Sequence, residues 1–92
     1  MATRTINKAF IMPNKLGMHL RAAVLFARTA SRFKAEIEVR KDDEVSDGKS
    51  NLGLMMLAAM EGDTIRVRVK GEDAPAAMNA ISNLFDRIFD EE

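Results

Sequence analysis

The sequence predicts an α+β fold, a two-layer open-faced sandwich with the element order β-α-β-β-α-β-α. Residues 34–40 and 64–70 alternate apolar and charged side chains, which is typical of strands with one face in water. Residues 20–32 and the segment after Pro75 carry apolar side chains at helical spacing. Strands with one apolar face and helices with one apolar stripe predict an antiparallel sheet with helices on one side only.

The first predicted element is a strand from Thr3 to Met12. Phe10 and Met12 favour one inward face for this strand. Ala9 and Ile11 favour the other, so the pattern leaves the phase open.

The chain then turns at residues 13–17, where Gly17 suits a positive φ. Leu16 and Met18 flank this glycine and are expected to pin the loop onto the core. A helix from about Leu20 to Arg32 follows. Its predicted buried stripe consists of Ala23, Phe26, Ala27, Ala30 and Phe33.

The middle of the chain is predicted to form a hairpin. Asp42 and Asp43 form its turn, and Glu44 to Asp47 is the return strand. A metal site at the two aspartates is the alternative, which no further carboxylate spacing supports. The strand before the turn, Lys34 to Arg40, points Ala35, Ile37 and Val39 inward.

Ser50 is an N-cap candidate for a second helix over residues 51–57, which Gly53 should keep short. The leucine and methionine side chains of this helix are predicted to fill the core. The alternative is an exposed apolar patch for a partner at Leu52 or Leu54, since methionine suits surfaces that meet several partners.

After a turn at residues 62–63, residues 64–70 form the clearest strand, with Arg66, Arg68 and Lys70 pointing outward. Acidic residues of the earlier strand can pair with this basic row across the open face. RNA binding by the row is the alternative, and the absence of tyrosine and tryptophan disfavours it.

The last helix is predicted to be capped by Asp73, with Pro75 in its first turn. The acidic end at residues 90–92 opposes the helix dipole and is expected to fray. The apolar stripe of this helix consists of Ala77, Ile81, Leu84, Phe85 and Ile88.

The length, net charge and residue composition of the chain disfavour several classes of function. The 92 residues are predicted to form a single domain, 1–92, with little room for a deep substrate pocket. A net charge of zero argues against binding nucleic acid or membrane surfaces by bulk electrostatics. One histidine and no cysteine argue against a zinc site or disulfide framework and fit a reducing compartment.

The sequence has no apolar run of ~20 residues and no recognisable signal peptide, so we expect a cytoplasmic protein that does not insert into a membrane. We also expect a monomer with no cofactor and no metal.

The single histidine, His19, lies where a loop ends and a helix begins. A neutral imidazole has a free lone pair, and a helix N-terminus offers N–H groups and partial positive charge to an anion. Arg21 can bring its guanidinium to phosphoryl oxygens. These residues predict that His19 accepts and releases a phosphoryl group, with a cap or surface role as the alternative. A stand-alone enzyme is disfavoured because the sequence shows no carboxylate pair, metal cluster or nucleophile–base pair.

On these motifs the chain resembles the HPr-family phosphocarriers of the bacterial phosphotransferase system. Residues 14–19, NKLGMH, are similar to the family's N-K-L-G-[LM]-H, and His19-x-Arg21 matches its H-x-R. Lys49-Ser50 before a short apolar helix resembles the family's regulatory serine segment. The turns at 61–63 and 71–73 also fall where the family has them.

The resemblance implies a phosphocarrier, not an enzyme, with enzyme I as phosphoryl donor and enzyme IIA domains as acceptors. The family's phosphorylated histidine, modified at Nδ1, corresponds to His19, and its phosphate-contacting arginine corresponds to Arg21. Ser50 corresponds to the serine that a dedicated kinase/phosphorylase modifies in some members, with regulatory proteins as further partners. The family's sheet has the antiparallel strand order 1-4-2-3.

The segment after the histidine departs from the family's H-[AT]-R-P-A. Leu20 replaces a small residue and is expected to crowd a partner's approach, and Ala22 replaces a proline that would preset the helix start. Asn51 stands where members commonly have a larger apolar residue. The alternative function is therefore an HPr-like regulatory binding module with little or no phosphotransfer. The expected partner-binding residues are Leu20, Asn51, Leu52, Leu54 and Met55.

Overall fold

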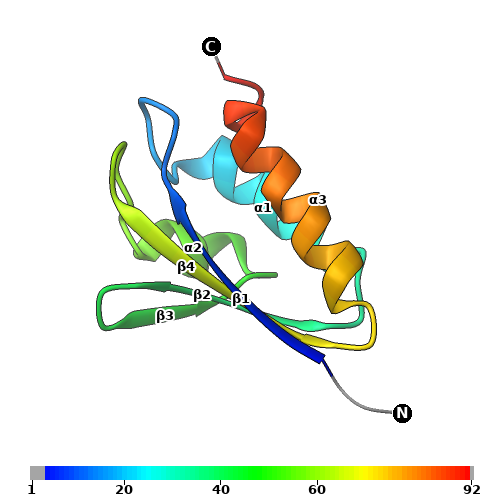
Figure 1. Ribbon diagram of the computed structural model, residues 1–92. Coiled ribbons are helices and arrows are strands. Elements are labelled where there is room, and N and C mark those ends of the chain that lie inside the picture. The colour runs from blue at the N-terminus through cyan, green and yellow to red at the C-terminus, as the bar shows by residue number, and fades with distance from the viewer. Residues whose placement is uncertain (1–3, 92) are drawn as a thin grey trace.

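The computed structural model describes residues 4–91, and it contains a sheet with helices on one face (Figure 1). The strands are β1 (Arg4–Ile11), β2 (Glu36–Lys41), β3 (Glu44–Asp47) and β4 (Thr64–Gly71). The helices are α1 (Leu20–Ser31), α2 (Asn51–Met56) and α3 (Ala74–Asp86), and a 3-10 turn follows as η1 (Ile88–Asp90). The predicted α+β sandwich and its element order are confirmed.

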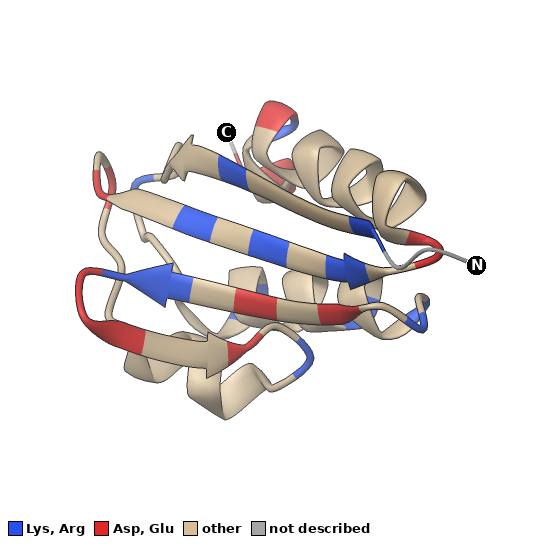
Figure 2. Ribbon diagram, turned by 60° about the horizontal axis from the view of Figure 1, so that its bottom comes forward, with Lys and Arg blue, Asp and Glu red and all other residues tan. Residues whose placement is uncertain are grey.

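The four strands form one antiparallel sheet in the order β1-β4-β2-β3. This is the order that the family resemblance implies. Helices α1 and α3 contact each other and lie across the same face (Figure 1), while Figure 2 shows the opposite face uncovered. The loop after β1, the start of α1 and the C-terminal turn gather at one end of the molecule (Figure 1).

The core between the two layers is built around Phe85. Its ring stacks on Phe10 with 4.1 Å between centroids, and it meets Phe26 and Phe89 edge-on at 6.4 and 5.0 Å. Phe26 and Phe89 are fully buried. These four rings fasten β1, α1, α3 and η1 to one another, because aromatic rings contribute large buried areas and directional contacts.

The bounds of the elements lie close to the predicted ones. Strand β3 spans Glu44–Asp47 as predicted, and the strands predicted at 34–40 and 64–70 each end one residue later. Helix α1 ends one residue early, so Phe33 lies beyond it and is half-buried. Thr3, the first residue of the first predicted strand, lies outside the described residues.

The inward face of β1 is that of Phe10 and Met12, which are both buried, whereas Ile11 is exposed. Lys8 lies on the same phase as Phe10, and its Nζ donates to Ser82 Oγ at 3.0 Å and lies 5.0 Å from the Phe10 ring centroid. Lys8 lies on the side of β1 that faces the core, and Ile11 lies on the side that faces solvent. The apolar–polar alternation therefore could not predict which side of the strand is buried.

Two predictions at the ends of α3 are wrong. Asp73 occupies the N-cap position, but its carboxylate does not cap the helix; it accepts hydrogen bonds from the backbone N–H groups of Lys34 and Ala35 at 2.8 and 2.9 Å. At the other end, Ile88 lies outside α3 and is half-buried, and Phe89 takes the fully buried position instead.

Acidic residues of β2 lie beside basic residues of β4 in the sheet (Figure 2). Glu36 is the register partner of Lys70, and Glu38 is the register partner of Arg68, on β2 and β4 respectively. Arg40 also pairs with Glu38, at 3.5 Å along the same strand. The predicted juxtaposition is confirmed for Lys70 and Arg68, which face Glu36 and Glu38, and is wrong for Arg66, whose register partner is Arg40, a like charge.

Candidate functional site

His19 is the N-cap residue of α1, with extended backbone angles of φ −79° and ψ −179°. Its carbonyl accepts the first helical hydrogen bond, from the Ala23 N–H at 2.9 Å. The N–H groups of Leu20, Arg21 and Ala22 therefore precede the helical ladder, as the first N–H groups of any helix do. The His19 side chain makes no cap bond, so it leaves this helix end open to an anion.

The loop before His19 is held by backbone contacts with a distant segment. The Met18 N–H donates to the Ala59 carbonyl at 2.9 Å, and Met18 is buried. Gly17 has a φ of +65°, and a Cβ there would lie 2.2 Å from the Ala59 oxygen. Of the two side chains that flank Gly17, Met18 is buried and Leu16 is exposed, so the expectation is confirmed for Met18 and wrong for Leu16.

The C-terminal turn returns to the histidine instead of fraying. Ile88, Phe89 and Asp90 all have left-handed backbones, with φ values of 56°, 52° and 60°. Such a conformation costs a non-glycine residue about 1–2 kcal/mol. The buried Phe89 ring offsets this cost, and the turn delivers Glu91 to the start of α1.

Glu91 contacts both the histidine and the loop before it. Its Oε2 lies 2.6 Å from His19 Nε2, and its Oε1 accepts from Asn14 Nδ2 at 3.1 Å. Burial acts to raise the pKa of Glu91, but the hydrogen bonds from His19 and Asn14 and the charges of His19 and Arg21 outweigh it and hold that pKa below its ordinary value. The site thus contains an ionised carboxylate, an imidazole and an exposed arginine.

Sequence reasoning missed Asn14 and Glu91 as parts of this site. Asn14 was matched only as part of a motif, and the acidic end was expected to fray. The signal that could have placed Glu91 is Phe89, because an apolar aromatic so close to an acidic end needs a buried position. The prediction of a frayed end is wrong for Asp90 and Glu91, and Glu92 lies outside the described residues.

Ser50 is the N-cap residue of α2, as predicted, and its Oγ accepts from the Gly53 N–H at 3.0 Å. Gly53 does more than keep the helix short. A Cβ at this position would lie 2.3 Å from Ser46 Oγ on β3, so glycine allows α2 to pack closely on the sheet. Ser50 is half-buried and already engaged with its own helix.

The expected partner-binding residues divide into exposed and buried ones. Leu20, Leu52 and Met55 are 57%, 69% and 37% exposed, and Asn51 is exposed as well. Leu54 is 0% exposed, so its assignment to a partner surface is wrong: it is on the α2 face that packs into the core. Exposed apolar side chains that the prediction did not include are Leu16, Met56 and Met60.

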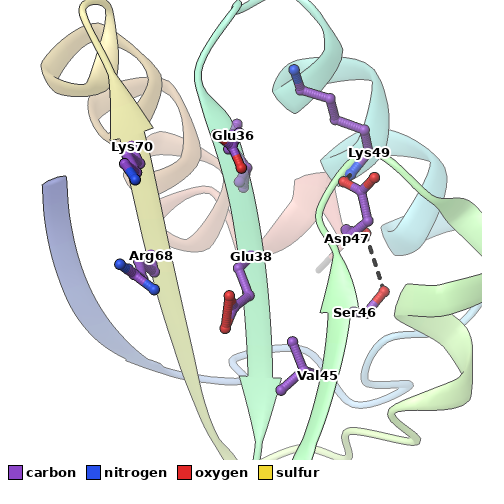
Figure 3. A pocket seen from close by; sticks show the side chains of 9 residues that line it. Glu36, Glu38, Val45, Ser46, Asp47, Lys49, Arg68 and Lys70 are labelled. Atoms are coloured by element: carbon purple, nitrogen blue, oxygen red, sulfur yellow. Dashed lines mark hydrogen bonds between the residues drawn. The ribbon is translucent and has the colours of Figure 1, made fainter. Parts of the chain in front are cut away.

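A hollow of about 450 Å³ opens on the uncovered sheet face (Figure 3). Glu36 and Glu38 line it beside Arg68 and Lys70, and Lys49 lies at its rim from the loop before α2. Because acidic side chains of β2 and basic side chains of β4 both line it, the hollow favours no single charge class of small ligand. Its lining includes neither His19 nor Ser50.

Asp42 and Asp43 form the β2–β3 turn, with Asp42 at a φ of 52°. Among residues 4–91, no group of three or more histidine, cysteine, aspartate or glutamate side chains is arranged to hold a metal ion. In the same range, no helix has the length and apolar character needed to cross a membrane.

The model of the family described as PTS HPr component phosphorylation site matches residues 6–87. The chain belongs to the HPr family. A phosphocarrier protein HPr of Neisseria meningitidis is 47% identical over 78 residues, covering 85% of this chain and 88% of the relative. A phosphocarrier protein NPr of Shewanella violacea is also 47% identical over 78 residues, covering 85% and 86%.

The solved structure of HPr-C-His from Thermoanaerobacter tengcongensis matches with a TM-score of 0.90 at 34% identity, over 95% of this chain and 98% of that one. HPr proteins are phosphocarriers of the phosphotransferase system rather than catalysts. The resemblance drawn from the NKLGMH loop and the H-x-R spacing is therefore confirmed at the level of the family.

Proposed function

We propose that this chain is a cytoplasmic histidine phosphocarrier in which His19 takes a phosphoryl group from enzyme I and passes it to enzyme IIA-type acceptors. The observation that carries the proposal is the open N-terminus of α1, where the side chain of the N-cap histidine leaves its own helix unbonded. The N–H groups of the first turn and Arg21 supply donors for phosphoryl oxygens.

The chemistry requires little from the carrier itself. The lone pair of His19 Nδ1 attacks phosphorus, the bond between phosphorus and the donor nitrogen breaks, and that electron pair returns to the donor. Transfer of this kind depends mainly on positioning and charge stabilisation. Arg21 is exposed, so its guanidinium can follow the phosphoryl group as it arrives and leaves. In the acceptor step a nucleophile of the acceptor attacks phosphorus, the bond between phosphorus and Nδ1 breaks, and its electron pair returns to His19.

The exposed apolar side chains beside the site suit partners that bind and leave. Leu20 lies next to His19, and Leu52 and Met55 project from α2, which contacts α1. Exposed leucine and methionine side chains can adapt to more than one partner surface. We assign these residues to the docking of enzyme I and enzyme IIA domains.

Ser50 is the proposed regulatory site, modified by a serine kinase/phosphorylase. A phosphate on Ser50 Oγ would lie at the N-terminus of α2, where partial positive charge favours it. The same phosphate would add up to two negative charges near Leu52 and Met55. Its expected effect is therefore on partner docking rather than on the fold.

Intact mass after incubation with phosphoenolpyruvate and enzyme I tests the central assignment. We expect one added phosphate that brief acid removes and that is absent from a folded His19→Ala variant. Arg21→Ala should slow labelling without abolishing it. Labelling of His19→Ala would contradict the assignment of His19. No labelling of the wild type by its cognate enzyme I would favour the regulatory binding module, with Leu20 and Ala22 as the changes that distinguish it.

A further inference from the structure

The side-chain carboxylate of Glu91 contacts Nε2 of His19, the ring nitrogen that the proposed transfer does not use. Its Oε2 is 2.6 Å from Nε2, and 72 residues separate the two in sequence. Imidazole has two ring nitrogens, and the partner of one decides whether the other carries a proton or a lone pair. The contact therefore bears directly on which nitrogen can attack phosphorus.

The geometry around Glu91 is fixed from two sides. On one side, three consecutive left-handed residues and the buried Phe89 ring set the direction of the chain that ends in Glu91. On the other, Asn14 Nδ2 donates both to Glu91 Oε1 at 3.1 Å and to the Gly17 carbonyl at 2.8 Å. Both neighbours of this amide nitrogen are acceptors, so the orientation of the Asn14 amide is set.

The direction of the Glu91–His19 hydrogen bond follows from charge. Burial acts to raise the pKa of Glu91, but the hydrogen bonds from His19 and Asn14 and the nearby positive charge hold it below the ordinary 4.5, so Glu91 is an ionised carboxylate at neutral pH. An ionised carboxylate can only accept hydrogen bonds. Nε2 must therefore be the donor, and in the neutral ring Nδ1 then carries the lone pair.

We propose that Glu91 is a positioning residue of the transfer site, which holds the Nε2–H of His19 so that the Nδ1 lone pair meets the phosphoryl donor. The inference rests on the proposed role of His19. It adds that the C-terminal turn selects the reactive nitrogen and fixes the plane of the ring. A carboxylate that fixes the tautomer of a reacting histidine acts in the same way in hydrolase triads.

The same carboxylate also has a role after transfer. When Nδ1 becomes bonded to phosphorus, Nε2 keeps its proton and the ring carries a positive charge. Glu91 then compensates that charge from the side opposite the phosphoryl group. Arg21, whose positive charge also helps to lower the pKa of Glu91, is exposed and free to turn towards the incoming phosphoryl oxygens.

Nitrogen NMR of the His19 ring, above the pH at which it is protonated, tests the positioning directly. The wild type should show the Nε2–H tautomer predominantly. Glu91→Ala should shift the population towards a mixture, and Glu91→Gln should restore the wild-type tautomer in part, because the amide oxygen still accepts. Asp90→Asn is the matched control, since Asp90 is exposed and pairs with Arg87 at 3.1 Å.

Transfer kinetics with phosphorylated enzyme I give the second readout. Losing the carboxylate behind a metal-bound histidine typically costs about tenfold to a hundredfold, and we take the same scale for a carboxylate that orients a reacting histidine. We expect Glu91→Ala to lose this much in the rate at saturating donor, with the KM for the donor unchanged and Asp90→Asn like the wild type. An unchanged tautomer in Glu91→Ala overturns the inference whether or not His19 is phosphorylated. A shifted tautomer with an unchanged transfer rate also overturns it. If His19→Ala were still labelled, the proposed function would fail separately.

Discussion

Helices α1 and α2 begin in the same way and use their first residues differently. Ser50 turns its Oγ onto its own helix and binds the Gly53 N–H at 3.0 Å. His19 occupies the equivalent N-cap position, makes no such bond, and reaches instead to Glu91. At the N-terminus of α2, the Ser50 side chain therefore accepts a hydrogen bond from a backbone N–H three residues later. At the N-terminus of α1, no side-chain cap accepts from the first N–H groups.

The difference shows that an N-cap position alone does not define an anion site. At α2 the hydroxyl satisfies the helix from within, which is the ordinary stabilising role of serine. At α1 the histidine is held by a loop and by a C-terminal turn that come from opposite ends of the chain. The proposed phosphoryl site is thus assembled from distant segments, and the cap of α2 is assembled locally.

The largest expected effect on stability comes from removing the Phe89 ring, which holds the C-terminal turn against the core. Phe89→Ala should lower the free energy of unfolding by about 3–5 kcal/mol, because Phe89 is fully buried against Phe85. Urea denaturation measures this. A loss below about 1 kcal/mol would show that the C-terminal turn is not part of the packed core.

A smaller effect on stability is expected at the N-terminus of α2, where Ser50 caps the helix. Ser50→Ala should lower the free energy of unfolding by about 1 kcal/mol, since it removes the acceptor for the Gly53 N–H. Ser50→Asp keeps an acceptor at the N-cap and should stay close to the wild type. Equal losses in both variants, measured by thermal denaturation, would contradict a capping role for Ser50.

The smallest expected effect is the pH dependence that Glu91 contributes. The pKa of Glu91 is lowered in the folded state from the ordinary 4.5. The stability that it adds is therefore fully present above that value and is lost as the pH falls through the lower, folded-state pKa. The difference in unfolding free energy between the wild type and Glu91→Gln, followed from neutral to acid pH, should shrink only in acid. A difference that persisted undiminished below pH 4.5, down to the most acidic pH measured, would contradict this contribution.

The contrast between local and distant construction also explains what the sequence alone could predict. The hairpin return strand Glu44–Asp47, the Ser50 cap and the positive φ of Gly17 depend on neighbours a few residues away, and each was predicted correctly. The strand order came from the family resemblance and not from the pattern. Of the site, His19 at the helix start was predicted, because its position depends only on where a loop meets a helix.

The predictions that were wrong involve contacts across long stretches of chain. Asp73 fits the local pattern of a cap, yet its carboxylate binds backbone N–H groups at Lys34 and Ala35. Leu54 was placed on a partner surface because the helical pattern of α2 is short and rich in apolar residues on several sides. Glu91 was expected to fray by the helix-dipole rule, which takes no account of a histidine 72 residues away.

The NMR spectrum of the phosphorylated, nitrogen-labelled protein decides which nitrogen of His19 carries the phosphoryl group. After treatment with enzyme I and phosphoenolpyruvate, we expect phosphorus on Nδ1 of His19 and a proton on Nε2. The amides of Leu20, Arg21 and Ala22 should shift, with the Gly53 amide unchanged. Phosphorus on Nε2 or on Ser50, or amide changes confined to α2, would contradict the proposed transfer site.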